Sequence, residues 1–358
     1  MVTGTIHRDP LARYDCNNNL CKEREIKMET IYKRRLGRSA IEVSALGMGC
    51  WAIGGPFWGG ETPLGWGEVD DQESIRAIHA ALDYGVNFFD TANVYGTGHS
   101  ERVLGTALAG RRAQVVVATK FNAVFDETSR QVTGADTSPA GIRAACEQSL
   151  QRLATDYIDL YQFHDNGFPP DQAIPVRDTL EALVAEGKIR AYGWSTDFPQ
   201  SAAFFASGAH CTAVQVQLNV LDDNPEVVRV CEANSLAAIC RGPLAMGLLT
   251  GKYTLTTKPS ADDVRGEKSP EWMKYFKNGQ PSPEFLQKID AVRQILTSGG
   301  RTLSQGALAW LWARSPQTIP IPGFRTAAQV KENCGALRFG PLARGPYEEI
   351  EGIFGREH

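Results

Sequence analysis

The feature that most constrains the fold of this chain is a repeated unit made of a short apolar run, a polar or glycine-rich loop, and an amphipathic helix. From about residue 45 the apolar run recurs eight times. The runs are Ala45–Trp51, Val86–Asp90, Gln114–Lys120, Tyr157–His164, Arg190–Ser195, Ala213–Asn219, Ala237–Arg241 and Thr318–Gly323. Nearly continuous apolar runs of this length are typical of strands buried on both faces of a parallel sheet.

Signals for helix starts and ends lie between these runs. Asp70 with Glu73 resembles a capping box, and Gly85 marks the end of the same helix. Ser138 and Asn224 each precede a proline, which is favoured in the first turn of a helix. Eight strands that alternate with helices predict an α/β protein, a (β/α)8 TIM barrel forming one domain. A doubly wound open sheet is the main alternative, but no GxGxxG follows the first run.

The domain organisation follows from where this pattern begins and ends. We expect a flexible N-terminal extension over 1–30, the barrel over 31–345 and a C-terminal tail over 346–358. The extension has no apolar stretch typical of a secretory signal, and Met28 is an alternative start. Residues 253–290 are rich in Lys, Pro, Ser and Gly without a clear strand, which predicts a long insertion after the seventh strand, over the barrel mouth.

Composition limits the function classes. The formal net charge is −4, so charge alone gives no reason to expect binding to nucleic acid or to an anionic membrane. No run approaches the roughly 18 apolar residues of a membrane span. Eight cysteines without regular spacing indicate free thiols in a reducing compartment, and hence a cytoplasmic protein. Cys16, Cys21 and His7 leave a zinc site incomplete, so no metal is expected. A monomer is the default expectation.

The reactive side chains stand where the runs end. Asp90, Lys120 and His164 end the second, third and fourth runs, and Tyr95 follows Asp90 by five residues. In a (β/α)8 barrel the active site lies at the C-terminal ends of the strands. The four side chains are therefore expected at one rim. Each alone also has a structural explanation, as a buried ion pair, a packed loop tyrosine or a core histidine.

These four residue types suit one kind of chemistry. Tyrosine has an ordinary pKa near 10 and is a poor acid at neutral pH, so we expect nearby Lys120 to lower the pKa of Tyr95. Asp90 would hold Lys120 in place, and a neutral His164 would orient a carbonyl oxygen. Such a group protonates an oxygen while hydride arrives at the adjacent carbon, which is general acid catalysis.

The segment around Tyr95 resembles a known family. Phe89–Gly96, followed by Gly98–Glu101 and Leu104-Gly105, is similar to the signature of the aldo-keto reductases, and the similarity runs from about Leu36 to Leu337. The resemblance implies a barrel, NAD(P)H as hydride carrier and reversible reduction of an aldehyde or ketone, including a sugar carbonyl, to an alcohol. It also implies a catalytic tetrad with Tyr95 as the proton donor, the other members being Asp90, Lys120 and His164.

A glycine-rich loop after the seventh run is the first candidate for holding the cofactor. Its backbone N–H groups and Lys252 would cradle a pyrophosphate, although such a loop also serves simply to turn the chain. The candidate residues there are Arg241, Gly242, Pro243, Leu244, Gly247 and Lys252.

The segment after the eighth run is the second candidate. A helix N-terminus beside an arginine is a natural anion site. The resemblance implies that this segment binds the 2′-phosphate and adenine, so Arg325 favours NADPH, with NADH also possible. Gln329, where some members have arginine, weakens that preference. The candidate residues are Gly323, Arg325, Gln329 and Asn333.

The resemblance further implies contacts to the nicotinamide half. Ser195 and Gln215 would bind its amide, and Cys50, Trp51 and Asp90 would lie beside it. The chain departs from many members by having Thr196-Asp197 in place of asparagine. It also has Arg241 where many stack a tyrosine, and a planar guanidinium can stack on a ring as well.

The substrate pocket is expected at the aromatic residues of the first strand and loop. Phe57 and Trp58 lie in the glycine-rich loop 54–67, and Trp51 ends the first run. Together with Tyr95 and His164 they would surround a small carbonyl compound. The alternative is that these aromatics only pack the loop onto the rim.

Two other function classes deserve comparison with the reductase. Some relatives are redox-sensing regulatory subunits that bind NADP and a membrane-channel partner, and turnover of carbonyls distinguishes the two. A barrel hydrolase would use a carboxylate pair such as Asp90 and Asp165, but it needs no lysine on the third strand.

Overall fold

The computed structural model describes residues 32–356. The expected extension over 1–30, with Cys16 and Cys21, lies outside the described residues. In the described part, the six cysteines are free and buried, as expected. No helix among these residues is long and apolar enough to cross a membrane.

An eight-stranded parallel sheet forms the centre of the fold, in the order β3-β6-β7-β10-β11-β12-β13-β16. Gly49 of the first strand forms a parallel bridge with Gly323, which lies just after the last strand, and Gly49 N–H donates to Pro322 O at 3.0 Å. These contacts close the barrel, which confirms the predicted fold. The strands are β3 (Met48–Gly49), β6 (Phe88–Asp90), β7 (Val116–Phe121), β10 (Ile158–Phe163), β11 (Ile189–Ser195), β12 (Cys211–Gln217), β13 (Ala237–Arg241) and β16 (Thr318–Pro320).

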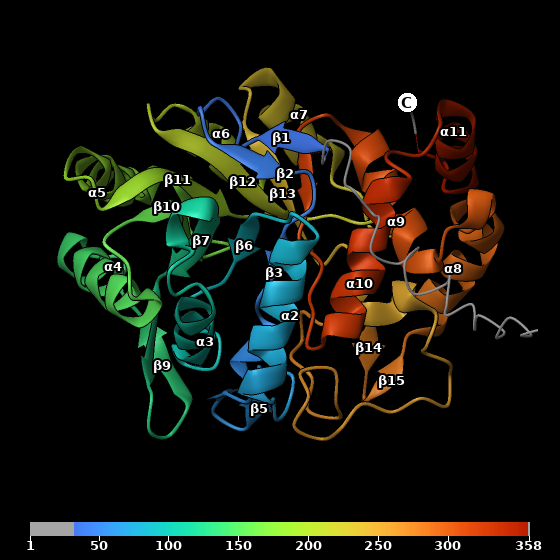
Figure 1. Ribbon diagram of the computed structural model, residues 1–358, viewed down its shortest axis with the longest axis horizontal. Helices are drawn as coiled ribbons and strands as arrows, with labels where there is room; N and C mark the ends of the chain where they lie inside the picture. The colour runs from blue at the N-terminus through green and yellow to red at the C-terminus, as the bar shows by residue number, and fades with distance from the viewer. Residues whose placement is uncertain (1–31, 357–358) are drawn as a thin grey trace, which may run out of the picture. The chain divides into compact units, whose positions relative to one another are not determined.

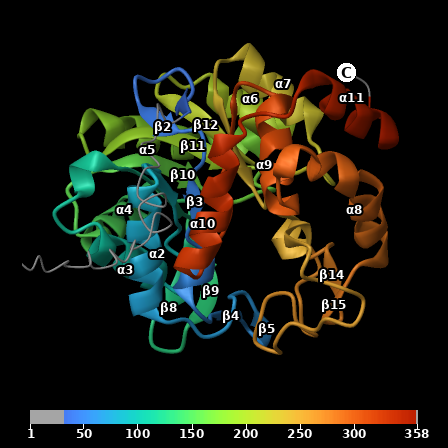
Figure 2. The ribbon, with the colours of Figure 1, turned by 45° about the vertical axis from the view of Figure 1, so that its right-hand side comes forward.

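Helices surround this sheet (Figures 1 and 2). The predicted caps are present: Asp70 accepts from the N–H groups of Gln72 and Glu73, and Ser138 and Asn224 cap their helices in the same way. The helices are α2 (Asp71–Asp83), α3 (His99–Ala107), α4 (Pro139–Leu153), α5 (Ile174–Ala185), α6 (Pro199–Ala206), α7 (Pro225–Ala233), α8 (Pro283–Leu296), α9 (Leu303–Arg314), α10 (Ala327–Gly335) and α11 (Arg344–Ile353).

The two ends of the barrel differ. At the N-terminal ends of the strands, the hairpin β1 (Lys33–Arg35) and β2 (Glu42–Ser44) contributes Leu36, Ile41 and Val43 to an apolar cluster with strand residues such as Phe88. The long loops lie at the opposite end, at the bottom of Figure 1. That end carries Asp90 and Lys120, two charged residues that are buried.

Three segments differ from the sequence expectation. The insertion after β13 contains a hairpin, β14 (Phe276–Lys277) with β15 (Gln280–Pro281), and it ends where α8 begins at Pro283. The expected C-terminal tail is instead largely helix α11, because Ile350 is buried and Glu351 accepts a hydrogen bond from the Trp310 indole at 2.9 Å. Strands β8 (Ala123–Asp126) and β9 (Gln131–Ala135) form an unpredicted hairpin that pairs with β4 (Trp58–Gly59) and β5 (Thr62–Pro63) in a small sheet.

Candidate active site

The C-terminal ends of three neighbouring strands bring the predicted tetrad together. Asp90 ends β6, Lys120 lies near the end of β7, and His164 directly follows β10. The Lys120 Nζ donates to Asp90 Oδ1 at 2.5 Å, to Thr91 O at 2.8 Å and to the Tyr95 hydroxyl at 3.2 Å. The ring of Tyr95 lies 6.1 Å from that of His164, nearly at a right angle.

Two glutamines complete the surroundings of Asp90. Its Oδ2 accepts from Gln162 Nε2 at 2.9 Å and from Gln215 Nε2 at 2.8 Å, and both glutamines are buried. Both carboxylate oxygens therefore have partners, and the three N–H bonds of Lys120 have three acceptors. Sequence reasoning missed Gln162. It lies on β10, two residues before His164, which directly follows the strand, so the two-residue period of extended backbone puts both on one face.

The electrostatics keep Lys120 charged. Burial acts to lower the pKa of Lys120, but the neighbouring Asp90 and Tyr95 outweigh it, and the pKa lies above its ordinary value. An ammonium group at 0% exposure is stable here because Asp90, itself 2% exposed, lies beside it. Lys120 is thus a fixed cation next to the Tyr95 hydroxyl.

The pKa of Tyr95 corrects the sequence expectation. Burial raises the pKa of Tyr95 more than Lys120 and Arg241 lower it, so the net shift is upward. Lys120 reduces the effect of burial without reversing it, because the same site that supplies the cation excludes water. Tyr95 therefore holds its proton at neutral pH, as a proton donor requires.

His164 is neutral, as the sequence analysis expects. Burial lowers the pKa of His164 to about 3, with further lowering by Lys120 and Arg241. The neutral imidazole places one N–H donor near the Tyr95 ring without adding another positive charge. Tyr95 and His164 can therefore both donate hydrogen bonds to one oxygen atom placed between them.

Comparison with known proteins decides the family. Residues 45–354 match the aldo/keto reductase family. The aldo-keto reductase YhdN of Bacillus subtilis is 34% identical over 310 residues, which cover 82% of this chain and 85% of that protein. The chain belongs to the aldo/keto reductase family. It is therefore an oxidoreductase, and the predicted resemblance is confirmed.

Other relatives and solved structures of this family agree with the fold. The chloroplastic pyridoxal reductase of Arabidopsis thaliana is 30% identical, covering 90% of this chain and 88% of that protein. The structure of the glycerol dehydrogenase of Gluconobacter oxydans is 32% identical with a TM-score of 0.74, covering 90% of this chain and 95% of the other. The structure of an aldo/keto reductase of Klebsiella pneumoniae, in complex with NADP and acetate, is 26% identical with a TM-score of 0.67. The match covers 92% of this chain and 97% of the other.

The residues expected near a nicotinamide lie around this tetrad. Ser195 and Gln215 are paired in register on β11 and β12, and both are buried. Trp51 stacks on Tyr95 with ring centres 5.8 Å apart. Cys50 donates its backbone N–H to Asp90 O at 2.7 Å, and burial raises the pKa of its thiol, so Cys50 is an uncharged wall residue.

Arg241, which the resemblance implies would stack on the nicotinamide, lies at the end of β13. Its guanidinium forms an ion pair with Asp197 and donates to Gln217 Oε1 at 3.1 Å. The charge of Arg241 adds to the lowering of the pKa of His164 and opposes the upward shift that burial causes in the pKa of Tyr95. The two departures from the family pattern, Asp197 and Arg241, therefore belong together, because the ion pair with Asp197 fixes the guanidinium of Arg241.

The loop after β13 fits an anion. Gly242 and Gly247 have φ values of +60° and +96°, which allow the sharp turns on both sides of Pro243 and Leu244. Burial lowers the pKa of Lys252, and the positive charges of Arg265 and Arg325 lower it further. Asp263 acts in the opposite direction and pairs with Arg265 at 2.6 Å, so an anion such as a pyrophosphate would meet mainly Lys252 and Arg325 here.

The start of α10 differs from the open anion site that the sequence predicts. Ala327 N–H donates to Glu73 Oε1 at 3.1 Å, so a carboxylate already caps this helix, as the helix dipole favours. Arg325 donates to the carbonyls of Trp66 and Glu68, and Gln329 Oε1 accepts from Arg325 N–H at 2.7 Å. The predicted residues Gly323 and Asn333 contact each other at 3.4 Å. A phosphate here would have to share Arg325 with the loop.

The predicted substrate residues separate into two groups. Trp51 stacks on Tyr95, whereas Phe57 is 3% exposed and lies in the buried cluster beneath them, with Ala92 and Val94. Trp58 belongs to β4 and donates its backbone N–H to Arg130 O at 2.9 Å, so it serves the small sheet. For Phe57 and Trp58, the structure therefore favours the alternative of loop packing.

Trp272, which sequence reasoning missed, completes the aromatic surroundings of Trp51. Its ring lies 6.2 Å from Trp51, and Trp66 lies 5.4 Å away on another side. Trp272 is 57% exposed and belongs to the insertion after β13. The available signal was its position in a segment already expected over the barrel mouth.

Proposed function

We propose that this protein reduces a small aldehyde or ketone to an alcohol with NADPH, in a reversible reaction. The observation that carries the proposal is the Lys120 ammonium, which contacts both Asp90 and the hydroxyl of Tyr95. NADPH, when bound, supplies the hydride to the carbonyl carbon. Tyr95 gives its proton to the carbonyl oxygen, and Lys120 stabilises the phenolate that remains, which is general acid catalysis.

The neighbouring residues orient the carbonyl and exclude water. His164, neutral because burial lowers its pKa to about 3, donates a hydrogen bond to the same oxygen. Trp51, stacked on Tyr95, covers the phenol from one side. Dry surroundings strengthen the attraction between Lys120 and the phenolate.

Residues on the strands β11, β12 and β13 and on the loops after β13 and β16 would hold the cofactor. Ser195 and Gln215 are placed to bind the nicotinamide amide, and Arg241 to stack on the ring. Lys252 and Arg325 would bind phosphate groups, which favours NADPH over NADH. Support comes from a Schizosaccharomyces pombe relative named aldo-keto reductase yakc [NADP(+)] and from a Klebsiella pneumoniae structure in complex with NADPH.

The substrate is proposed to be a small molecule at Trp51, Tyr95 and His164, and a sugar carbonyl is one candidate. We also propose a cytoplasmic monomer, and the free cysteines among the described residues support a reducing compartment.

A carbonyl panel assayed with NADPH and NADH tests the function. We expect consumption of NADPH with at least one aldehyde, loss of that activity in Tyr95→Phe, and full activity in the matched control Tyr84→Phe. Tight binding of NADPH without turnover of any carbonyl would instead identify a regulatory binding protein.

A further inference from the structure

Three buried side chains beside the tetrad form a closed group of hydrogen bonds. Gln162 Nε2 donates to Asp90 Oδ2 at 2.9 Å, and Gln215 Nε2 donates to the same oxygen at 2.8 Å. Gln215 Nε2 also donates to Gln162 Oε1 at 3.2 Å, which closes the group. All three residues are at most 2% exposed, so water does not compete for these bonds. Each side chain of the group therefore holds the other two.

The charge of Asp90 fixes the orientation of both amides. Asp90 forms an ion pair with Lys120, and an ionised carboxylate only accepts hydrogen bonds. Each glutamine must therefore turn its NH2 group, and not its carbonyl oxygen, toward Asp90. The two N–H bonds of the Gln215 amide are then used, one on Asp90 and one on Gln162. A reversed amide would place the Gln215 oxygen against two other oxygens, so only its Oε1 is left for a further partner.

Gln215 Oε1 is free to receive such a partner. It accepts no hydrogen bond from any residue that the structure describes, and it is not among the unpaired atoms that protein covers completely. The same holds for the hydroxyl of Ser195, which is paired in register with Gln215 on the neighbouring strand. An amide oxygen and a hydroxyl group therefore lie on adjacent strands with their hydrogen-bonding capacity unused.

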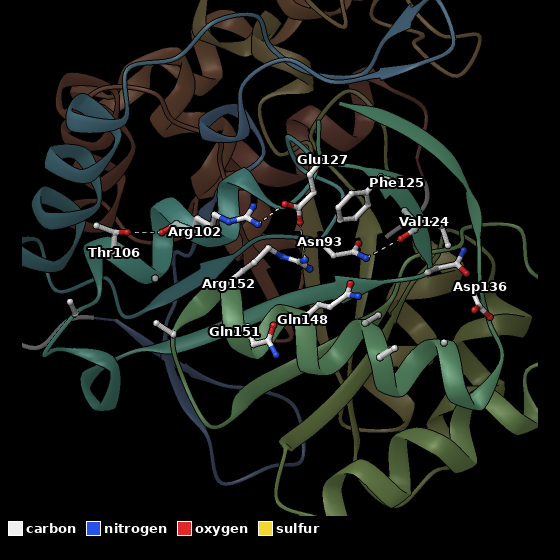
Figure 3. A pocket seen from close by; sticks show the side chains of 18 residues that line it. Asn93, Arg102, Thr106, Val124, Phe125, Glu127, Asp136, Gln148, Gln151 and Arg152 are labelled. Atoms are coloured by element: carbon white, nitrogen blue, oxygen red, sulfur yellow. Dashed lines mark hydrogen bonds and ion pairs between the residues drawn. The ribbon is translucent and has the colours of Figure 1, made fainter. Parts of the chain in front are cut away.

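A cavity outside the barrel has no such open pair. It measures about 910 Å³ and lies where α3 and α4 face the β8–β9 hairpin (Figure 3). Asn93 Oδ1 and Arg152 Nη2 in its wall also have no partner, but protein covers both atoms completely. Arg102 and Arg152 both pair with Glu127 there. The open polar atoms of Ser195 and Gln215 are therefore a property of the barrel mouth and not of this outer cavity.

We propose that Gln162 is a positioning residue, which fixes the amide of Gln215 so that Gln215 Oε1 accepts an N–H of the nicotinamide carboxamide. This inference rests on the proposed use of NADPH. A carboxamide has an NH2 group that donates and a carbonyl oxygen that accepts, which matches an amide oxygen beside a hydroxyl group. Gln162 itself touches neither coenzyme nor substrate and acts only through Gln215.

Asp90 is then a common anchor for two parts of the reaction. Its Oδ1 holds Lys120 beside the Tyr95 hydroxyl, and its Oδ2 holds the two glutamines. The proton donor and the residue that faces the coenzyme are thus positioned by the two oxygens of one carboxylate.

The test compares the binding of NADP+ with that of its 3-acetylpyridine analogue, in which a methyl group replaces the carboxamide NH2. Quenching of tryptophan fluorescence in the full chain measures both dissociation constants without turnover. We expect the Kd of the analogue to be about tenfold higher, because the Gln215 oxygen is left buried without a donor. Both coenzymes keep a carbonyl oxygen for Ser195 and the same adenine half, so the ratio of the two Kd values isolates the contact to Gln215.

Two glutamine variants test the positioning. Gln162→Met removes both polar atoms of Gln162 and keeps the length of the side chain. Gln215 then keeps only its bond to Asp90 and can swing about it, so the Kd ratio should fall to about threefold or less. Gln305→Met is the matched control, because Gln305 is also buried and bonds to Thr302 and Glu332 away from the tetrad. Its Kd ratio should equal that of the unchanged chain.

The outcomes separate this inference from the proposed function. Equal Kd values for NADP+ and the analogue in the unchanged chain would overturn the inference without any variant. A purely structural Gln162 would raise both Kd values by one factor in Gln162→Met and leave their ratio unchanged. Carbonyl turnover together with either result would overturn the inference alone, whereas a chain that binds no NADP+ would overturn the proposed function as well.

Discussion

The tetrad and the candidate phosphate-binding region lie at the same end of the barrel but are built in different ways. Asp90 and Lys120 are on paired strands, are at most 2% exposed, and are fixed by sheet register. Lys252 and Arg325 are on loops, and Arg325 is held by carbonyl groups of another loop. Strand ends fix the distances that proton transfer needs, whereas loops bring together charge that can adjust to a bound cofactor.

We expect the largest effect from a substitution in the tetrad, whose residues are fixed by the strand ends. Lys120→Met removes the cation beside Tyr95 and should lower kcat by about 10²–10⁴-fold, because the phenolate loses its stabilising charge. The dissociation constant of NADPH, measured by fluorescence titration, should change little. Unchanged turnover would contradict the role of Lys120.

The second prediction concerns the loops around the candidate phosphate-binding region. Arg265 is 8% exposed, forms an ion pair with Asp263 at 2.6 Å and lies over the ring of Trp66 at 4.4 Å. Arg265→Ala leaves Asp263 buried without its cation, which costs about 3–5 kcal/mol of stability. We expect a lower midpoint of thermal unfolding and faster proteolysis at 254–262. Arg293→Ala, which breaks an exposed pair, is the control and should behave like the unchanged chain.

The third prediction is a pH dependence of stability caused by His164. Its pKa falls from 6.5 to about 3 on folding, so the unfolded chain binds the extra proton between these values. Stability from this group is complete above pH 6.5 and is lost as the pH falls toward 3, by at most about 1.4 kcal/mol per pH unit.

Urea unfolding between pH 6.5 and 4 measures this slope. His164→Asn should flatten it, and Tyr95→Phe, which keeps the imidazole, should not. A slope that is the same in all three proteins would show that His164 titrates normally.

The smallest expected effect is on cofactor preference. Arg325→Ala should weaken NADPH by about tenfold and NADH much less, since only NADPH carries the 2′-phosphate. Arg338→Ala, in the short 3-10 helix that follows α10, is the control. Equal losses for both coenzymes would mean that Arg325 acts only by holding the carbonyls of Trp66 and Glu68.

Sequence reasoning succeeds where periodicity and strand register determine position. The runs ending in Asp90, Lys120 and His164 became neighbouring strands, and alternate residues of a strand necessarily share a face. Position could thus be predicted for the tetrad, although burial raises the pKa of Tyr95 against the expectation from Lys120 alone. The sign of that pKa shift depends on how much water the fold excludes from Tyr95. The spacing of residues in the sequence does not contain this information.

The missed features depend on contacts between distant segments. Glu73 caps α10 from another helix, and Trp272 meets Trp51 from an insertion more than two hundred residues along the chain. Helix α11 is stabilised by Ile350 and by the pairing of Glu351 with Trp310. Each pairing is one of many that the sequence permits, and only the folded arrangement selects it.

The loop between β3 and α2 contacts three other segments near the barrel mouth. Trp58 pairs with Gln131 of β9, Gly65 O accepts from Val264 N–H at 2.7 Å, and Glu68 O accepts from Arg325. Exchanging one of these loops with that of a homologue would break contacts to its neighbours. Engineering a new substrate preference in this enzyme therefore requires transplanting the connected loops as one unit.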